Sequence, residues 1–243
     1  WNVVALAAII CLAASLGASV ILNRVKERAG FTRFIWVLAI SVVVGFGIWA
    51  THFIAMLAYK PGSEFTYAPN QTLLSLLVII AISIPAFTLI ASTGSRFASR
   101  FGGVMFGLAI AAMHYTGMEG LMPEGTMIWD KNFVIASVLA AVILSTIAVE
   151  MHHMSGRIAG QIGTAIFLAF AICATHFLGM SALTISPLGG LRTMETGLSP
   201  DVLGTIIAAT SIIVLQAGVA AAIFDSWFHD KKQADEWQLT KHE

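Results

Sequence analysis

Three histidines interrupt otherwise apolar stretches of this chain. His52, His114 and His176 are 62 residues apart, and a methionine follows each of them four positions later. A single histidine in a membrane helix often just hydrogen-bonds a neighbouring helix. An ionisable side chain there is nevertheless costly, which makes it a candidate functional residue. Three copies in one register favour a shared ligand role over packing.

Each motif presents an imidazole and a thioether side by side, because residues four apart lie on nearly the same helix face. If three such helices face one axis, their side chains converge on one site. Neutral imidazole binds copper, zinc, iron or nickel, and thioether narrows the choice toward copper, particularly Cu(I). Haem is an alternative, and zinc is a weaker one because methionine is not among its usual ligands. The predicted metal ligands are His52, Met56, His114, Met118, His176 and Met180.

Other side chains near the motifs are weaker candidates. Met113 directly precedes His114 and points about 100° away from it on a helix. Cys173 lies three residues before His176 and could donate a thiolate, although the usual role of such a residue is apolar packing. Met151–Met154 reads Met-His-His-Met and could form a second metal site, but neighbouring histidines diverge on a helix.

The composition indicates a polytopic membrane protein. Of 243 residues, 58% are hydrophobic and 11% are charged, and the mean hydropathy is +0.86. Soluble domains carry about 25% charged residues. A lipid bilayer is therefore the expected partner, and the zero net charge gives no support for a nucleic-acid partner. No nucleophile–base pair, phosphate loop or paired carboxylates occur in the apolar stretches, so catalysis within this chain is disfavoured.

Seven apolar stretches are long enough to cross a bilayer, which needs roughly 20 residues per helix. The motifs fall in the second, fourth and sixth stretches. We therefore expect an all-α, polytopic membrane helix bundle with seven transmembrane helices, built from one helix plus three helix-pair repeats of about 62 residues. Residues 1–224 would form this membrane domain and 225–243 a cytoplasmic tail or a linker to an output domain. The predicted spans are 1–22, 34–58, 71–91, 102–121, 132–150, 158–183 and 201–224.

The distribution of basic residues predicts the orientation, because cytoplasmic loops are enriched in Lys and Arg. Three residues lie on one side, namely Lys60, Lys131 and Arg192. Ten lie on the other: Arg24, Lys26, Arg28, Arg33, Arg96, Arg100, Arg157, Lys231, Lys232 and Lys241. The N-terminus is therefore expected in the periplasm and the C-terminus in the cytoplasm. All three motifs would then share one depth, near the outer face.

With Met113-His114-Tyr115-Thr116 in view, the chain resembles the bacterial MHYT domain, an integral membrane sensor domain of the bacterial inner membrane. Two copies read Thr-His-Phe instead but keep the histidine and the later methionine. The resemblance implies bound copper and the sensing of a diatomic gas such as O2, CO or NO, or of copper itself. It also implies a cytoplasmic output domain that makes or hydrolyses cyclic di-GMP. The positions that match the family's motif are His52, Met56, Met113, His114, Met118, His176 and Met180.

The first functional hypothesis is thus a signalling sensor, in which the seventh helix carries a change at the metal into the tail from Asp225. A copper carrier or transport protein is the alternative, and a haem-binding membrane protein is a third possibility. A carrier would need metal-binding sites that can be reached from both faces of the membrane, and Met151–Met154 could form the second of these sites.

Overall fold

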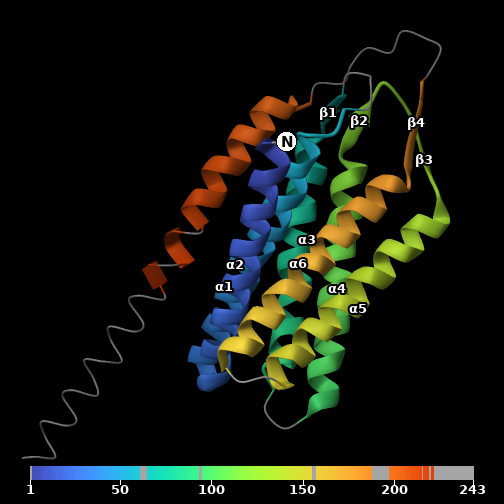
Figure 1. Cartoon of the computed structure of the whole chain (residues 1–243). Coiled ribbons are helices and arrows are strands. Elements are labelled where there is room, and N and C mark those ends of the chain that lie inside the picture. The colour runs from blue at the N-terminus through green and yellow to red at the C-terminus, as the bar shows by residue number, and fades with distance from the viewer. Residues whose placement is uncertain are drawn as a thin grey trace, which may run out of the picture.

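The computed structural model is a bundle of helices and describes residues 2–60, 65–92, 95–154, 157–187, 197–214, 216–218 and 220–221. Within these residues, seven helices are long and apolar enough to span a membrane, which confirms the predicted fold class. The predicted tail from Asp225 lies outside the described residues. The helices are α1 (Asn2–Glu27), α2 (Gly30–Met56), α3 (Pro69–Ile90), α4 (Arg96–Glu119), α5 (Lys131–Met154), α6 (Arg157–Ser181) and a seventh, unlabelled helix over Pro200–Gly218 (Figure 1).

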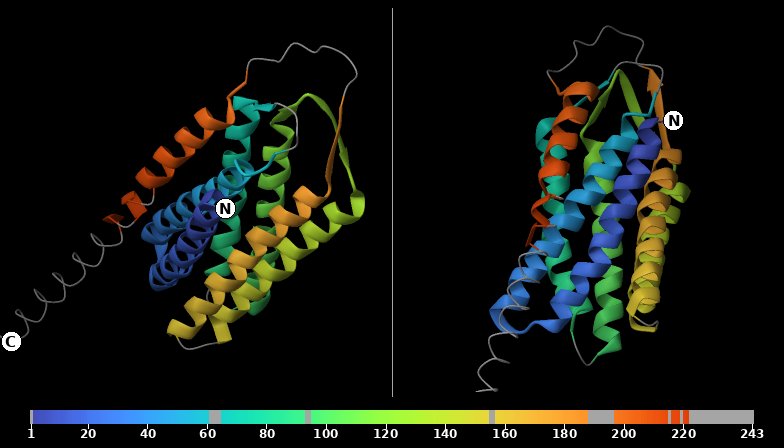
Figure 2. Two further views of the ribbon diagram at one scale, coloured as in Figure 1. Left: turned by 45° about the horizontal axis from the view of Figure 1, so that its top comes forward. Right: turned by 60° about the vertical axis from the view of Figure 1, so that its left-hand side comes forward.

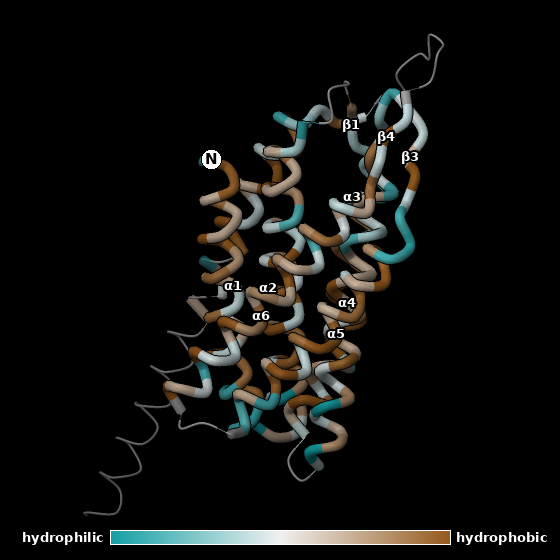
Figure 3. Tube along the Cα trace, turned by 45° about the vertical axis from the view of Figure 1, so that its right-hand side comes forward, coloured by the Kyte–Doolittle hydropathy of each residue, from teal (hydrophilic) through white to brown (hydrophobic). Residues whose placement is uncertain are grey.

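Several helices extend beyond the apolar stretches that predicted them. α1 continues to Glu27, and α4 begins at Arg96 rather than at 102. Local capping explains the early start of α4, because the hydroxyl of Ser95 accepts a hydrogen bond from the backbone N–H of Ala98. Pro69 occupies the first turn of α3, where its missing N–H costs nothing. Polar helix ends thus project past the hydrophobic windows (Figure 3).

The three helices that carry the histidines form an inner group. α3 packs against both α2 and α4, α5 packs against both α4 and α6, and α1 packs against both α6 and α2. The three outer helices therefore fill the three gaps between the inner ones (Figure 2). α1 fills the gap between α6 and α2. By the pattern of the other two repeats, the helix that follows α6 would be expected in that gap. The seventh helix packs on α2 instead, with Gly204 against Leu57 and Gly218 against Val43.

Two small antiparallel sheets lie at one end of the bundle (Figure 1). β1 (Phe65–Tyr67) pairs with β2 (Leu121–Pro123), and β3 (Gly125–Trp129) pairs with β4 (Leu183–Pro187). The sequence analysis predicted an all-α bundle and did not predict these strands. These strands are three to five residues long and pair across more than fifty residues, so no local pattern predicts them. They follow α2, α4 and α6, and therefore connect the same ends of the three inner helices.

Glycines allow α4 to approach its neighbours at backbone distance. A Cβ added at Gly107 would lie 2.6 Å from the carbonyl oxygen of Ala141 and 2.6 Å from the Cα of Val142 in α5. One added at Gly102 would lie 2.7 Å from the carbonyl oxygen of Ala86 in α3. Small residues at helix interfaces replace the hydrophobic driving force that the bilayer does not supply.

Gly107→Ala is expected to destabilise the bundle, because the new methyl meets rigid backbone and forces α4 and α5 apart. The expected cost is about 1–3 kcal/mol, as for overpacked cores. Gly17→Ala is the matched control, since nothing lies within 4 Å of a Cβ at Gly17 in α1. Thermal unfolding in detergent would compare the two variants. An unchanged Tm for Gly107→Ala would contradict the close approach.

Candidate metal centre

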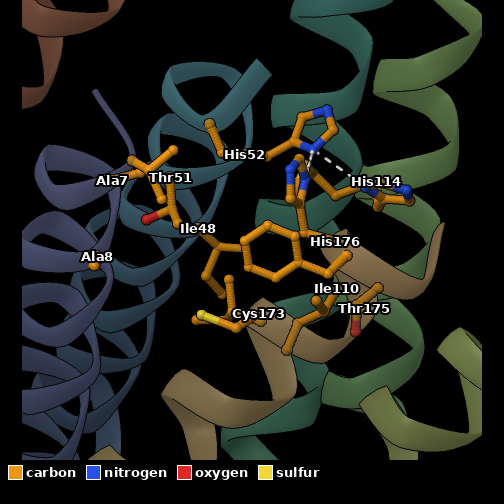
Figure 4. Close-up of a pocket in the computed structure, with 15 residues that line it drawn as sticks. Ala7, Ala8, Ile48, Thr51, His52, Ile110, His114, Cys173, Thr175 and His176 are labelled. Atoms are coloured by element: carbon orange, nitrogen blue, oxygen red, sulfur yellow. Dashed lines mark hydrogen bonds between the residues drawn. The ribbon is translucent and has the colours of Figure 1, made fainter. Parts of the chain in front are cut away.

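The bundle brings the three motif histidines together in its interior. The Nδ1 atom of His52 lies 3.1 Å from the Nδ1 of His114 and 3.1 Å from the Nδ1 of His176. One nitrogen from each ring falls within 4.8 Å of the other two. Figure 4 shows the rings pointing toward one another from three different helices. The side chains are 3%, 1% and 8% exposed, so water does not solvate them.

Hydrogen bonding among the rings is incomplete. A neutral imidazole has one N–H and one acceptor nitrogen, so the single Nδ1 of His52 cannot bond well to two other Nδ1 atoms at once. The Nε2 atoms of His52 and His114 are buried and have no partner among the described residues. A buried polar atom without a partner costs about 1–3 kcal/mol. The cluster therefore retains unused capacity to bind a ligand.

Two of the three nitrogen separations match the geometry of a single metal ion. Two nitrogens that bind an ion at about 2.0 Å with a tetrahedral angle are about 3.3 Å apart. Both short Nδ1–Nδ1 distances are 3.1 Å, close to that value. Three converging imidazoles in a dry interior thus form a set that can hold a divalent or monovalent transition metal.

Glycines of the motifs make room for the rings. A Cβ added at Gly179 would lie 2.2 Å from the Nε2 of His114, and one added at Gly117 would lie 3.1 Å from the Nε2 of His52. Each glycine stands three residues after the histidine of its own helix. In α4 and α6, the imidazole of the preceding repeat therefore packs against this glycine. Ala55 occupies the equivalent position in α2 and lines the same cavity as His176.

A cavity of about 60 Å³ lies beside the histidines. Three isoleucines line it, each four residues before a motif histidine and each at most 3% exposed: Ile48, Ile110 and Ile172. Since they lie one helical turn before the histidines, and the strands follow the same three helices, they close the side away from the strands. The sequence analysis missed them. Their 62-residue period was the available signal, but isoleucine does not stand out in an apolar helix.

The residues directly before the histidines also line the cavity, namely Thr51, Met113 and Thr175. The hydroxyls of Thr51 and Thr175 donate to the carbonyls of Gly47 and Ala171 in their own helices, at 2.8 and 2.7 Å. They consequently offer the cavity little polarity. Met113, the weaker candidate from sequence, is thus the motif methionine that faces the cavity.

The other methionines lie elsewhere. Met56 and Met118 are 0% and 1% exposed, and Met180 is half-buried against the core, but none of the three lines the cavity. Four residues along a helix rise about 6 Å, which moves each methionine one turn beyond its histidine toward the strands. Cys173, in contrast, lines the cavity.

The histidines at the end of α5 belong to a separate environment. The Nε2 of His153 lies 2.8 Å from the hydroxyl of Ser99 in α4. Met151 packs against Gly163 of α6, while the Nδ1 of His152 is buried without a partner. The side chain of Met154 lies outside the described residues. These side chains point toward different neighbours, as expected for adjacent positions on a helix.

Aromatic side chains cover the triad on the strand side. The ring of Phe53 packs edge-on against His52 at 4.7 Å and against Tyr67 of β1 at 5.7 Å between centroids. Tyr67 is 1% exposed, and burial raises the pKa of its phenol, so it stays neutral. Its backbone pairs with Leu198, just before the seventh helix. A stack of buried rings thus separates the triad from the strand end of the molecule.

Fold and site together define a multi-pass membrane protein with a buried centre of three histidines. A family model for the MHYT repeat, described as a bacterial signalling protein N terminal repeat, matches residues 45–103 and 107–165. The chain therefore belongs to the MHYT family. His176 lies beyond the two matched segments, yet it completes the same cluster as His52 and His114.

The curated relatives are signalling proteins. A signaling protein of Caulobacter vibrioides is 32% identical over 93% of this chain and 28% of its own length. The bifunctional diguanylate cyclase/cyclic di-GMP phosphodiesterase MucR of Pseudomonas aeruginosa is 32% identical over 92% of this chain and 33% of its own length. The cyclic di-GMP phosphodiesterase NbdA of the same organism is 31% identical over 91% and 29%. The chain spans about a third or less of these relatives. No solved structure matches it.

Gly179→Ala is expected to push the imidazole of His114 out of the cluster, because the new methyl would lie 2.2 Å from its Nε2. The affinity of the triad for a transition metal should fall about 10- to 100-fold, as when the support of a metal ligand is lost. Gly163→Ala in the same helix is the control, since its added Cβ meets only the side chain of Met151, at 3.2 Å or more. Competition titration with a Cu(I) chelator measures both. Equal affinities would refute this role of Gly179.

Proposed function

We propose that this chain is a membrane sensor module that holds copper at His52, His114 and His176 and relays the state of that site to a cytoplasmic signalling domain. The observation that carries the proposal is the convergence of three buried imidazole nitrogens from three repeats. A copper ion would supply a centre to which a small uncharged molecule, such as a diatomic gas, binds.

The surroundings of the triad favour copper over zinc. Met113 and Cys173 both line the cavity beside the histidines, and sulfur ligands are soft. Met56, Met118 and Met180 lie one helical turn from the histidines, toward the strands, and are more distant thioether ligand candidates. Our proposal makes the histidines the primary ligands and Met113 the nearest thioether.

The size of the cavity favours a bare ion over haem. Pockets for drug-sized organic molecules are about 300–1,000 Å³, whereas the cavity here is about 60 Å³. The three isoleucines on its inner side separate the triad from the basic end of the bundle. That apolar floor favours a sensor over a carrier, which needs a polar route to both faces.

Relay to an output domain is supported by the relatives and by packing. MucR and NbdA are named as cyclic di-GMP enzymes, and this chain aligns with less than half of each. The seventh helix packs on α2, the helix of His52. A displacement of α2 would therefore reach the seventh helix directly. We propose that the full-length protein makes or hydrolyses cyclic di-GMP through a domain outside this chain.

The orientation of the module follows from its charged end. The turns that join α1 to α2 and α3 to α4 lie together at the end opposite the strands (Figure 1). These turns and the helix ends beside them carry the basic residues Arg24, Lys26, Arg28, Arg33 and Arg96. By the positive-inside rule we place this end in the cytoplasm and the strands in the periplasm of a bacterial inner membrane.

Replacing any one of the three histidines by leucine, which preserves volume, is expected to lower the copper bound to purified protein at least about tenfold, because two imidazoles hold an ion far less tightly than three. Met113→Leu should weaken Cu(I) binding more than Met118→Leu. His153→Gln is the control outside the triad. Elemental analysis of membranes and of purified protein gives the copper-to-protein ratio. Undiminished copper in the triple leucine variant would rule out this site.

The proposed orientation predicts different labelling of two new cysteines in a background without Cys11 and Cys173. A cysteine at Thr126 in β3 should react with a membrane-impermeant maleimide added to intact cells. A cysteine at Ala29, between α1 and α2, should react only after the cells are opened. Both positions are exposed, so accessibility differs only through the membrane. The reverse pattern would invert the topology.

A further inference from the structure

The cavity beside the triad is not symmetric, although the three motifs are. Among the outer helices, only α1 contributes to its lining, through Val4, Ala7 and Ala8. No residue of α3 or α5 lines it. The cavity therefore extends from the histidines toward α1, in the gap between α2 and α6. Figure 4 shows Ala7 and Ala8 at the side of the pocket that faces away from His114.

This side of the cavity reaches the lipid-facing surface. Ala8 is exposed, and Phe177 of α6 is 55% exposed, yet both line the cavity that also contains the histidines. Ala7, the next residue of α1, is 4% exposed and forms the inner wall. A small side chain on α1 opposite one aromatic ring on α6 thus separates the cavity from the bilayer.

The other directions are closed by well-packed side chains. Ile48, Ile110 and Ile172 block the route from the basic end of the bundle, since each is at most 3% exposed. On the strand side, Phe53 and Tyr67 are 0% and 1% exposed and stack over His52. Both routes to water are therefore blocked in the described residues, whereas the lateral route crosses a single layer.

We propose that the ligand of this site comes from the hydrocarbon core of the membrane, between α1 and α6 past Ala8 and Phe177, and not from the aqueous face. The identity of the centre rests on the function proposed above, but the route does not. An apolar gas concentrates in the bilayer, so lateral access delivers it where it is most abundant.

The same passage selects the ligand by chemistry. Among the described residues, no Asp, Glu, Lys or Arg lines the cavity, and the hydroxyls of Thr51 and Thr175 donate to carbonyls of their own helices. A charged solute would lose its hydration without compensation. The cavity of about 60 Å³ is well below the about 300–1,000 Å³ of pockets for drug-sized molecules, so it suits small uncharged ligands.

Cys173 offers a test that needs no metal. The chain has two cysteines, so Cys11→Ser leaves Cys173, which lines the cavity, as the single thiol. Methylmercury chloride is small and uncharged, and it reacts as RSH + CH3HgCl to give RS–HgCH3 and HCl. Metal-free protein in liposomes would be exposed to it, and mass spectrometry would follow the adduct over time.

Ala8→Leu should slow the labelling of Cys173 about tenfold by narrowing the passage, and Phe177→Ala should accelerate it. Ala5→Leu is the matched control, because Ala5 is an exposed alanine of the same helix that does not line the cavity. A sulfonated, charged mercurial should leave Cys173 unlabelled. Equal rates for Ala8→Leu and Ala5→Leu, or rapid labelling by the charged reagent, would overturn lateral access.

These outcomes are independent of copper binding. If the histidine variants retain copper while Ala8→Leu slows labelling, the metal site is wrong and the passage stands. If the histidine variants lose copper while all labelling rates agree, the passage is wrong and the metal site stands.

Discussion

The burial of three imidazoles at one point sets the architecture of this protein. In the hydrocarbon layer no water is present to satisfy their nitrogens, so the rings must find partners in each other or in a bound ion. Nitrogen separations of 3.1 Å require the three inner helices to approach closely. Gly117 and Gly179 permit that approach, because a methyl at Gly179 would overlap the ring of His114 and one at Gly117 would press on the ring of His52. The outer helices then only fill the gaps.

α2 has a special position in this arrangement. Its His52 contacts both other histidines, its Phe53 connects the triad to β1 through Tyr67, and its outer side receives the seventh helix. Tyr67 also pairs with Leu198 at the start of that helix. The triad is thus linked to the seventh helix by two contiguous sets of contacts, one through the membrane face of α2 and one through the strands. A sensor of the proposed kind needs such a connection.

The repeat also explains where the symmetry ends. Three equivalent helices supply histidines, isoleucines and, at two of three positions, glycines. α3 and α5 close two gaps, whereas α1, which lies outside the three helix-pair repeats, closes the third with small side chains. The three histidines are related by the repeat, but the outer helices around them are not, so the side toward α1 differs from the other two. The cavity extends to that side, which gives a ligand a direction of approach.

The sequence by itself determined the seven helices, the 62-residue repeat and the three histidines, because hydropathy and a fixed period are properties of the chain. The spacing of four put Met56, Met118 and Met180 first as ligands, and that ranking stays a prediction. In the structure it is Met113, the weaker candidate, that lines the cavity. Helical rise and the crossing of the inner helices decide which neighbour of each histidine faces the centre. The two sheets, the isoleucine floor and the placement of α1 also depend on contacts between residues far apart in sequence. Only the tertiary structure could decide them, since an apolar residue looks the same in the sequence whether it faces lipid, a neighbouring helix or a cavity.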